Sequence, residues 1–438
     1  MRQEKWALLD AIAARRTKVG VVGLGYVGLP LSMAFGNAGF RVLGLDIDAR
    51  KVEAIEKGEC YFRHLDAASL AWLAGEGRLI ASQDFQRAAE LDCVVICVPT
   101  PLTRQREPDM SFIVETARAL APHVRPGQLF VLESTTWPGT TEEIVRPILE
   151  SGGLKAGVDF HLAFSPERED PGVHASTSVP KLVGGLSPDC LELACALYAT
   201  VVPRVVPLSS TRAAEMAKLL ENIFRAVNIA LVNELKMLCD RMGLDVWEII
   251  DAAATKGFGF MAFQPGPGLG GHCIPIDPFY LTWKAREFEL QTRFIELAGE
   301  INTQMPRYVV HRTQEALNAR ERALRGARVL VLGVAYKKDV DDLRESPALR
   351  VIELLMEGGA EVRYHDPHIA QLGQTREHSF DLSSVPLDEA AFEWADVVMI
   401  LTDHSDVDYG AVVRGAKLIV DTRNATRGLG GTEHVVRA

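Results

Sequence analysis

Residues 17–48 read TKVGVVGLGYVGLPLSMAFGNAGFRVLGLDID, and this stretch decides the fold of the first half of the chain. An apolar run leads into a glycine-rich turn, a segment with helical periodicity follows, and a second apolar run ends in an acid. This order of strand, turn, helix and strand predicts a βαβ unit. The two strands of such a unit are parallel and buried on both faces, which explains why they are almost wholly apolar.

Three glycines, Gly23, Gly25 and Gly28, match G-x-G-x-x-G where the first strand meets the helix. Glycine at the second position lets the backbone approach a pyrophosphate, and the helix N-terminus holds phosphates with its unpaired N–H groups. The motif therefore predicts a dinucleotide site made by Gly23, Gly25, Tyr26, Val27 and Gly28. A tight turn from strand to helix without any ligand is the alternative.

Asp46 ends the second strand, about 20 residues after the glycines, where an acid can bind the ribose 2′-hydroxyl of a dinucleotide. A carboxylate at this position disfavours the 2′-phosphate of NADP. The expected cofactor is therefore NAD.

Two later loops, VPTP (98–101) and ESTTWPG (133–139), also follow predicted strands. Open parallel sheets bind their ligands at the carboxyl ends of the strands, so we expect Thr100, Thr135 and Thr136 to contact the cofactor. Capping of the next helix is an equally good explanation for any one of these hydroxyls.

The rest of the chain predicts an α/β protein in which a central helical domain joins two Rossmann-like, doubly wound domains. The apolar runs at 91–101, 127–136 and 159–167 continue the first domain, which is expected to span residues 1–206. Apolar residues then recur every three or four positions over many turns, which predicts a long helix, capped by Gly243, in a central domain at 207–324. Strand and helix patterns resume in a second α/β domain at 325–438.

Composition narrows the class of protein. The chain has 438 residues, 47% hydrophobic and 24% charged, with a net charge of −11, which argues against a nucleic-acid binder. The seven cysteines have no regular spacing, so we expect reduced thiols and a cytoplasmic protein. No apolar run approaches the roughly 20 residues that span a bilayer, so no membrane is expected. We expect no metal.

Two polar side chains share a face of the long predicted helix: Lys218 and Asn222, four residues apart. Near a cofactor, such a pair can polarise or protonate a substrate oxygen, although most helical lysines are solvated surface residues. Glu167, just past a strand end, is a possible base or only a loop charge.

The segment GPGLGGHCIPIDP, residues 266–278, presents one thiol on a backbone that neither helix nor strand tolerates. A reactive cysteine needs access and a nearby cation, and the glycine loop and Lys218 can supply them to Cys273. Asp277 can orient water. From these residues alone a catalytic thiol and a structural one remain equally acceptable.

Five motifs together resemble the UDP-glucose/GDP-mannose dehydrogenase family, in the right order over nearly the whole chain. They are GVVGLGYVGLPL (20–31), SPERED (165–170), EMAKLLENIFRAVNIALVNE (215–234), GPGLGGHCIPIDP (266–278) and GVAYKKDVDDLRESPA (333–348). Within the family, the second and fourth motifs resemble most closely the UDP-N-acetylglucosamine 6-dehydrogenases of bacterial surface-polysaccharide and lipopolysaccharide synthesis.

The resemblance implies a four-electron oxidation of the C6 alcohol of a UDP-sugar to a uronic acid. The alcohol loses hydride to NAD⁺, and the nucleophile, which falls on Cys273, captures the aldehyde as a thiohemiacetal. A second NAD⁺ takes another hydride, and water hydrolyses the resulting thioester. A thiolate forms this adduct more readily than a hydroxyl, which explains a cysteine at this position.

The other family roles fall on matching residues. Lys218 and Asn222 match the groups that stabilise the developing oxyanion, and Asp277 and Thr136 match those that handle water and protons. Glu167 matches a general acid/base.

Substrate contacts are implied for the residues that match the family's substrate-binding segments and side chains: Glu167, Arg168, Lys218, Asn222, Gly266, Gly270, Lys337 and Arg344. The resemblance also implies a homodimer or higher homo-oligomer built on the long helix.

The identity of the sugar depends on one short motif. SPERED replaces a longer stretch typical of UDP-glucose enzymes, which favours UDP-N-acetylglucosamine, with Arg168 the candidate that recognises the difference; UDP-glucose and the N-acetylmannosamine and N-acetylgalactosamine analogues stay open. A two-electron hydroxy-acid dehydrogenase also places Lys and Asn four apart on a helix, but leaves Cys273 and the last domain without a role. A non-catalytic NAD-binding sensor would make the thiol loop accidental.

Overall fold

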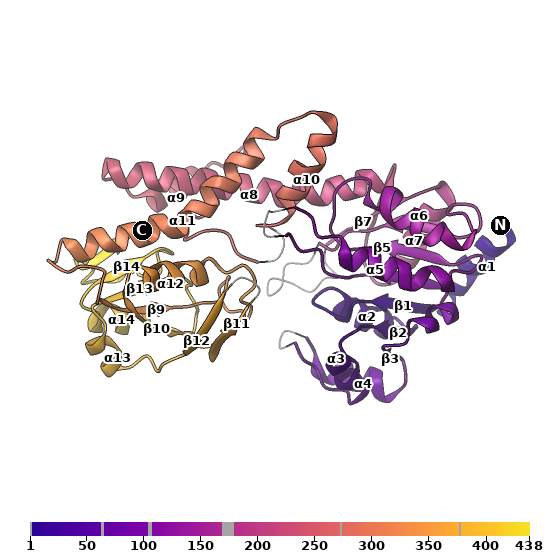
Figure 1. The fold of residues 1–438 in the computed structure, drawn as a ribbon, viewed down its shortest axis with the longest axis horizontal. Helices are drawn as coiled ribbons and strands as arrows, with labels where there is room; N and C mark the ends of the chain where they lie inside the picture. The colour runs from indigo at the N-terminus through magenta and orange to yellow at the C-terminus, as the bar shows by residue number, and fades with distance from the viewer. Residues whose placement is uncertain (1, 63–64, 104–106, 169–178, 272–273, 376–377) are drawn as a thin grey trace. The chain divides into compact units, whose positions relative to one another are not determined.

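The computed structural model describes residues 2–62, 65–103, 107–168, 179–271, 274–375 and 378–438, and it divides into two compact units. Unit 1 comprises residues 1–221 and 279–290, and unit 2 comprises residues 222–278 and 291–438. Two helices, α8 and α10, have residues in both units; Figure 1 labels the elements.

Unit 1 is built around a sheet with the strand order β3-β2-β1-β4-β5-β6-β7-β8. Its strands are β1 (Lys18–Val22), β2 (Arg41–Leu45), β3 (Leu79–Ser82), β4 (Cys93–Ile96), β5 (Leu129–Leu132), β6 (His161–Phe164), β7 (Lys181–Gly185) and β8 (Val205–Leu208). All neighbouring pairs are parallel except β6 and β7, which are antiparallel. The βαβ prediction for residues 17–48 is confirmed, with Val19 opposite Val42 in the register.

The helices with residues in unit 1 lie before, between and after its strands. They are α1 (Arg2–Ala13), α2 (Gly28–Asn37), α3 (Ala49–Glu56), α4 (Ala67–Gly75), η1 (Phe85–Glu90), α5 (Ser111–Leu120), η2 (Ala121–His123), η3 (Thr141–Val145), α6 (Arg146–Leu149), η4 (Glu150–Gly152), α7 (Pro188–Tyr198), α8 (Thr211–Met242), α10 (Asp277–Ala285) and η6 (Arg286–Phe288).

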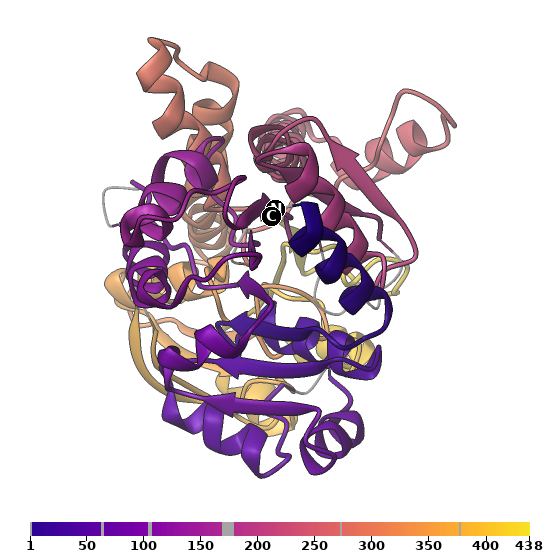
Figure 2. The ribbon, with the colours of Figure 1, turned by 90° about the vertical axis from the view of Figure 1, so that its right-hand side faces the viewer.

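Alternate side chains of one strand pack into two different cores, which shows why helices cover both faces of the sheet. Leu129 and Val131 of β5 belong to a core with α1, α2, α3, α4 and α7, whereas Phe130 and Leu132 belong to a core with α5, η3 and α6. Successive side chains of a strand point to opposite faces, so a strand that is apolar throughout needs helices on both sides. Figure 2 shows the strands of unit 1, in indigo to magenta, between these helices.

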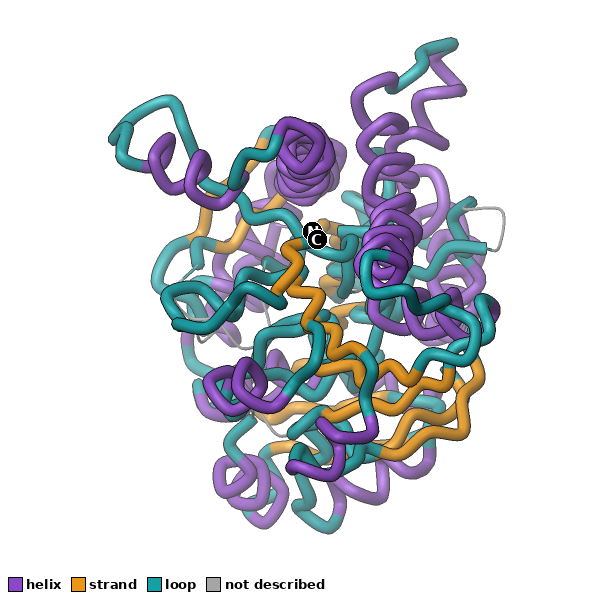
Figure 3. Tube along the Cα trace, turned by 90° about the vertical axis from the view of Figure 1, so that its left-hand side faces the viewer, coloured by secondary structure: helices purple, strands orange, loops and turns teal. Residues whose placement is uncertain are grey.

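Unit 2 contains a second, fully parallel sheet with the order β10-β9-β13-β14-β15. Its strands are β9 (Arg328–Leu332), β10 (Glu361–His365), β13 (Val397–Ile400), β14 (Ile419–Asp421) and β15 (Val435–Arg437), and a separate antiparallel pair is formed by β11 (Gln371–Gln374) and β12 (Ser379–Ser383). Helices α11 (Arg293–Asn318) and α12 (Pro347–Glu357) pack on one face of the main sheet, and α13 (Glu389–Trp394) and α14 (Tyr409–Gly415) on the other (Figure 3).

The long predicted helix is α8, and it spans 32 residues. Gly243 follows it with φ +70°, as predicted for a glycine that ends a helix, and α9 (Val246–Ala254) then begins with Asp245 as its N-cap. Val232 and Cys239 of α8 pack against Trp247 of α9. Within the described residues no helix is both long and apolar enough to cross a bilayer.

The two sheets share one structural device at the carboxyl end of the second strand. Asp46, after β2, accepts the Leu24 N–H at 2.7 Å, and Asp366, after β10, accepts the Val334 N–H at 2.7 Å. In each sheet this bond fixes the loop that follows the first strand. The fold class predicted from the sequence, two doubly wound α/β regions joined by a helical segment with a long helix, is confirmed.

Asp366 is the more strongly held of these carboxylates. Burial raises its pKa, but hydrogen bonds from His404 and from the Val334 N–H outweigh that effect and lower the pKa of Asp366 to about 2. A carboxylate whose folded-state pKa is depressed stabilises the fold above the pKa of the unfolded chain, near 4, and this stabilisation is lost as the pH falls toward 2.

We predict that Asp366→Asn lowers the free energy of unfolding at pH 7 by on the order of 2 kcal/mol, because the charge-assisted bonds are lost. Thermal melting of wild type and variant between pH 7 and pH 3 measures the effect, and the gap should narrow below about pH 4. Asp381→Asn, at an exposed carboxylate of the same unit, is the control and should change little. A gap that stays constant down to pH 3 would contradict this account.

Candidate functional site

The three glycines of the turn after β1 have different surroundings. Gly23 has φ +91°, and a Cβ there would lie 2.8 Å from the Cys97 carbonyl oxygen. A Cβ on Gly28 would lie 1.8 Å from the Gly23 carbonyl oxygen, so this position tolerates only glycine. A Cβ on Gly25 would meet no protein atom within 4 Å. Packing thus requires the outer two glycines, whereas Gly25 leaves its backbone open to a ligand.

Asp46 closes the other side of this turn. Its carboxylate accepts hydrogen bonds from the Leu24 N–H at 2.7 Å, the Asp48 N–H at 2.9 Å and the Lys51 ammonium at 3.0 Å, and the side chain is 6% exposed. The Tyr61 hydroxyl donates to the Leu24 carbonyl at 2.7 Å. The predicted cofactor residues from Gly23 to Asp46 are therefore brought together by these bonds.

The residues inside the glycine motif begin helix α2. Val27 is the N-cap and makes no side-chain capping bond, so no N-cap side chain competes with an anion at this helix N-terminus, where the Leu29 N–H donates to the Gly25 carbonyl at 3.1 Å. The ring of Tyr26 lies 4.3 Å from that of Phe62. The turn, the uncapped helix and the acid after β2 together fit a dinucleotide.

The two later loops lie at the carboxyl ends of β4 and β5, as predicted. Thr100 is buried, and its carbonyl accepts the Tyr280 hydroxyl at 2.8 Å. Thr135 is half-buried and Thr136 is fully buried. Among the described residues, the Thr136 hydroxyl has no hydrogen-bond partner. A buried hydroxyl without a partner is unfavourable unless a ligand or water completes it, so Thr136 suits a ligand-binding role.

The first turns of α8 are tied to the loop after β5. Glu215 is fully buried and accepts hydrogen bonds from the Gly139 N–H at 2.5 Å, the Thr141 N–H at 2.9 Å and the Thr141 hydroxyl at 2.7 Å. Burial raises the pKa of Glu215 in spite of these donors. Lys218 follows three residues later on the same helix and is 5% exposed. Glu215 therefore fixes the turn of α8 that carries Lys218.

Asn222 and Asp277 are in direct contact within unit 2. The Asn222 amide nitrogen donates to the Asp277 carboxylate, and the Asn222 amide oxygen accepts from Arg225. Asn222 is fully buried and Asp277, the first residue of α10, is 2% exposed. The structure thus joins two of the predicted catalytic residues, which lie 55 positions apart in the sequence.

The glycine loop that begins at Gly266 packs closely against unit 2. The Gly266 N–H donates to Asn233 of α8 at 3.0 Å, and a Cβ on Gly266 would lie 2.6 Å from the Arg423 guanidinium. A Cβ on Gly270 would lie 2.6 Å from Tyr336. Glycine is needed here because the loop lies directly on these side chains. Cys273, the predicted nucleophile, lies outside the described residues.

The loop between β9 and α12 carries the other predicted substrate residues, Lys337 and Arg344. The Arg344 guanidinium forms a bidentate ion pair with the Asp342 carboxylate, with a shortest N–O distance of 2.7 Å. The Arg344 carbonyl accepts the Gly271 N–H at 3.0 Å. Asp339 and Glu345 of this loop have positive φ, 59° and 49°. The loop is held in this conformation by its own ion pair and by the glycine loop.

Glu167 and Arg168 lie after β6 in unit 1. The Arg168 N–H donates to one Glu167 oxygen at 2.6 Å, and the Lys181 ammonium approaches the other at 2.9 Å. The Arg168 guanidinium pairs with Glu221 at 2.6 Å and donates to the Pro180 carbonyl at 2.6 Å. The guanidinium is therefore engaged by protein groups, and its predicted role in recognising the sugar stays a prediction.

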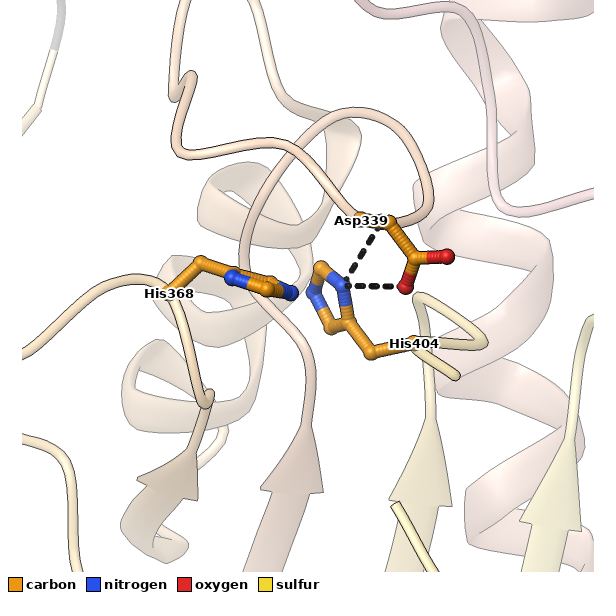
Figure 4. Close-up of side chains that lie close together, drawn as sticks. All are labelled: Asp339, His368 and His404. Carbon is orange, nitrogen blue, oxygen red and sulfur yellow. Dashed lines mark hydrogen bonds and ion pairs between the residues drawn. The ribbon is translucent and has the colours of Figure 1, made fainter. Parts of the chain in front are cut away.

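Figure 4 shows the one group of described residues whose spacing suits a metal: Asp339, His368 and His404, with ligand atoms within 4.8 Å of one another. The Nδ1 atom of His404 accepts the Asp339 N–H at 3.0 Å, so the ring proton lies on Nε2, which is 3.2 Å from the Asp366 carboxylate. Both nitrogens of His404 are thus engaged in hydrogen bonds. We interpret the group as a link that fastens the loop after β9 to Asp366.

Comparison with known proteins identifies the relationship. Sequence profiles of the UDP-glucose/GDP-mannose dehydrogenase family match in order: the NAD binding domain at residues 17–202, the central domain at 212–304 and the UDP binding domain at 330–428. The chain belongs to this family. It is an oxidoreductase, an NAD-dependent nucleotide-sugar dehydrogenase, as the resemblance implied.

Similar proteins carry several substrate names. The chain is 36% identical over 403 residues to the UDP-N-acetyl-D-mannosamine dehydrogenase of Escherichia coli K12, covering 88% of this chain and 93% of that one. It is 34% identical over 423 residues to the UDP-N-acetyl-D-glucosamine 6-dehydrogenase of Pseudomonas aeruginosa, covering 96% and 95%. The solved structure of a UDP-D-ManNAc dehydrogenase from Pyrococcus horikoshii superposes with a TM-score of 0.85 at 33% identity, covering 94% and 97%.

Sequence reasoning missed several residues that the fold brings to these sites. Lys181 and Glu133 contact each other beside Glu167, and Arg423 lies against Gly266 with its Nε donating to the Leu401 carbonyl at 2.9 Å. Burial lowers the pKa of Arg423, a sign of a cation with little water around it. The available signal was a polar residue at the end of an apolar strand: Glu133 follows β5 directly, and Arg423 is the second residue after β14. Lys181 begins a strand that the sequence analysis did not predict.

We predict that Asp46→Ala weakens NAD binding by about tenfold or more, because a charge-assisted bond to the ribose is lost. Titration of NAD against intrinsic tryptophan fluorescence measures the affinity. Asp366→Asn is the matched control, since it alters the equivalent carboxylate of the other sheet and should leave NAD affinity unchanged. Unchanged affinity in Asp46→Ala would rule out the ribose contact.

Proposed function

We propose that the protein catalyses the four-electron oxidation of the C6 alcohol of a UDP-N-acetylhexosamine to the corresponding uronic acid. The observation that carries the proposal is the hydrogen bond between the buried residues Asn222 and Asp277. Asn222 lies one helical turn after Lys218 in the sequence, and Asp277 lies four residues after Cys273. This arrangement supports a site where an oxyanion and a water molecule are both handled.

Lys218 and Asn222 would stabilise the negative charge that develops on the sugar oxygen, at roughly 3 kcal/mol for each donor. Among the described residues no carboxylate pairs with the Lys218 ammonium, although the side chain is buried. A buried cation of this kind favours an anionic partner. Asp277, held by Asn222, would orient the water that hydrolyses the thioester, and Glu167 would exchange the proton.

Cys273 would add as thiolate to the C6 aldehyde and form a thiohemiacetal, which the second oxidation converts to a thioester. Water then releases the carboxylate and restores the thiol. The sum is one alcohol, one water and two NAD⁺ giving one carboxylate, two NADH and three protons. Bound NAD supplies the hydride acceptor for each oxidation, and Gly25, Asp46 and Thr136 would contact it.

The UDP moiety would be held by unit 2. The profile of the UDP binding domain covers 330–428, which includes Lys337, Arg344 and Arg423. Cations at the end of a parallel strand and in the loop beside it suit a diphosphate. Gly266 and Gly270 would line the same ligand, because they keep the loop flat against Arg423 and Tyr336.

The sugar is proposed to be N-acetylglucosamine, with N-acetylmannosamine as the second candidate. The residues 165–170 favour an N-acetylated hexosamine, and the relative from Pseudomonas aeruginosa is named for N-acetylglucosamine. The relative from Escherichia coli K12, with a similar identity, is named for N-acetylmannosamine.

Domain boundaries at 206 and 324 are part of the same proposal. The family profiles end at 202 and 304 and resume at 212 and 330, which supports three functional regions: 1–206 for NAD, 207–324 for catalysis and 325–438 for the UDP-sugar. The six described cysteines are unpaired, which supports a cytoplasmic setting.

We also propose a homodimer built on α8. Five large apolar side chains between residue 224 and the end of the helix are exposed on one side: Phe224 at 46%, Leu231 at 54%, Leu235 at 39%, Leu238 at 52% and Met242 at 60%. Their spacing of seven, four, three and four residues places them in one helical stripe. An apolar stripe of this length suits the same stripe of a second copy across a twofold axis.

The stoichiometry of the reaction tests the function. We predict two NADH for each UDP-N-acetylglucosamine consumed, because the thiol retains the aldehyde until the second oxidation. Absorbance at the NADH band and chromatography of the sugar nucleotide give the two amounts. One NADH per sugar would support a two-electron dehydrogenase, and none with any UDP-hexose of a panel would support a non-catalytic NAD binder.

Cys273→Ser separates binding from chemistry. This variant should lose most turnover, by about a thousandfold, while NAD and UDP-sugar still bind, because a hydroxyl is a much weaker nucleophile. Asn222→Asp is a companion variant that alters the oxyanion donor. Normal formation of the acid by Cys273→Ser would contradict the covalent scheme.

Substitution of the α8 stripe tests the dimer. We predict that Leu231→Glu with Leu238→Glu yields a monomer in sedimentation velocity, because two charges would be buried in the shared interface. Met356→Glu, at a methionine of the same unit that is 47% exposed on α12, is the matched control and should leave the oligomer intact. A wild-type monomer at micromolar concentration would contradict the proposal.

A further inference from the structure

A buried lysine in unit 1 is shared by two carboxylates. Lys181 is the first residue of β7, and β7 runs antiparallel to β6. Its first residue therefore lies at the edge where the parallel strands β5 and β6 end. Glu133 follows β5 directly, and Glu167 follows β6 by three residues. The one reversal of direction in this sheet thus puts a cation among groups that come from the ligand-binding edge.

The distances define a three-membered ionic cluster. The Lys181 ammonium lies 3.1 Å from Glu133 Oε2 and 2.9 Å from Glu167 Oε2. The other oxygen of each acid is also engaged: the Tyr198 hydroxyl donates to Glu133, and the Arg168 N–H donates to Glu167 at 2.6 Å. Each carboxylate is therefore held at two points. With both acids ionised, the cluster carries a net charge of −1.

The two acids differ in their access to solvent. The Glu133 side chain is 0% exposed and that of Glu167 is 18% exposed, while Lys181 is 6% exposed. Burial raises the pKa of Glu133, although Lys181 opposes the shift. Burial lowers the pKa of Lys181, but the two carboxylates outweigh it and raise that pKa, so the ammonium stays charged at neutral pH. Glu167 is thus the member of the cluster able to exchange protons with a ligand or water.

A small cavity adjoins the cluster. It has a volume of about 20 Å³ and is lined by Glu167, Arg168, Lys181 and Tyr198 together with apolar side chains. This space is sufficient for about one water molecule with polar partners. A water molecule in this cavity would therefore offer Glu167 a partner for proton exchange other than Glu133.

We infer that Lys181 is a positioning residue for Glu167: it fixes one oxygen of the Glu167 carboxylate and, balanced by Glu133, sets the pH at which Glu167 gains or loses its proton. The inference rests on the acid/base role of Glu167 in the proposed function. A purely structural ion pair would hold the three strand ends together but would not tune Glu167. Among the residues that the structure describes, the charged and titratable groups around Glu167 include Glu133 after β5, Lys181 on β7, Tyr198 on α7, Cys97 after β4, and Arg168 with its partner Glu221 on α8.

Two substitutions should shift the pKa of Glu167 in opposite directions. Lys181→Met removes the cation and leaves a side chain of similar length, so the limb of the pH–rate profile due to Glu167 should move up by about one to three pH units. Glu133→Gln removes the competing negative charge, so the same limb should move down. Lys181→Arg keeps the charge and should restore a profile close to wild type. The limb is identified as the one that Glu167→Gln abolishes.

The kinetic parameters separate positioning from binding. In Lys181→Met, kcat at pH 7 should fall by about tenfold or more, while KM for NAD and for the UDP-sugar changes by less than about threefold. Carboxyl ¹³C NMR titration of the protein without ligands gives the same shift independently of activity, with Glu167→Gln to assign the signal. Lys181→Met leaves the buried Glu133 and the partly exposed Glu167 without their shared cation, so the single variant has a reason not to fold. In that case the double variant Lys181→Met/Glu133→Gln preserves the net charge of the cluster.

Opposite shifts in the two single variants, with rescue by Lys181→Arg, would establish the inference. Shifts in the same direction, or no shift of Glu167 by NMR in folded variants, would overturn it and leave a structural ion pair. A wild-type protein without dehydrogenase activity, or a Glu167→Gln variant with full activity, would instead refute the acid/base role of Glu167, and the NMR result would still decide whether Lys181 controls that carboxylate.

Discussion

An aspartate at the end of the second strand fixes the loop that follows the first strand in each of the two doubly wound sheets. Asp46 and Asp366 both accept an N–H of the loop that follows the first strand of their sheet, at the same distance of 2.7 Å. A loop that must leave its backbone open to a ligand cannot be stabilised by packing on that side. The buried carboxylate supplies the missing constraint from the other side.

The two sheets differ in what surrounds this aspartate. Asp46 has Lys51 as its additional partner and belongs to the NAD binding domain of the family, whereas Asp366 is closed off by His404, a histidine with both ring nitrogens engaged. The same topology thus places Asp46 where a ribose is proposed to bind in one sheet, and it places Asp366 in a hydrogen-bond network internal to the protein in the other. This difference explains how one architecture serves two ligands in one chain.

Much of the functional arrangement was predictable because it follows from periodicity and glycine. The first βαβ unit, the long helix ended by Gly243 and the second parallel sheet were all expected from the sequence. The pairing of Lys218 with Asn222 on one helix face followed from their spacing. The reversed strand β7, the pair β11 and β12, and the contacts of Lys181, Glu215 and Arg423 were not predicted, because each depends on which distant segment lies alongside.

The sequence by itself determined the class of the fold, the NAD motif and the family, since these rest on local patterns: apolar periods, a glycine turn at a strand end and an acid at a fixed interval. Only the tertiary structure decided which charges meet. Asn222 reaches Asp277 across 55 positions, and Lys181 reaches Glu133 across 48, through strand order and direction. Ion pairs and hydrogen bonds act over a few ångströms, and no local pattern encodes that proximity.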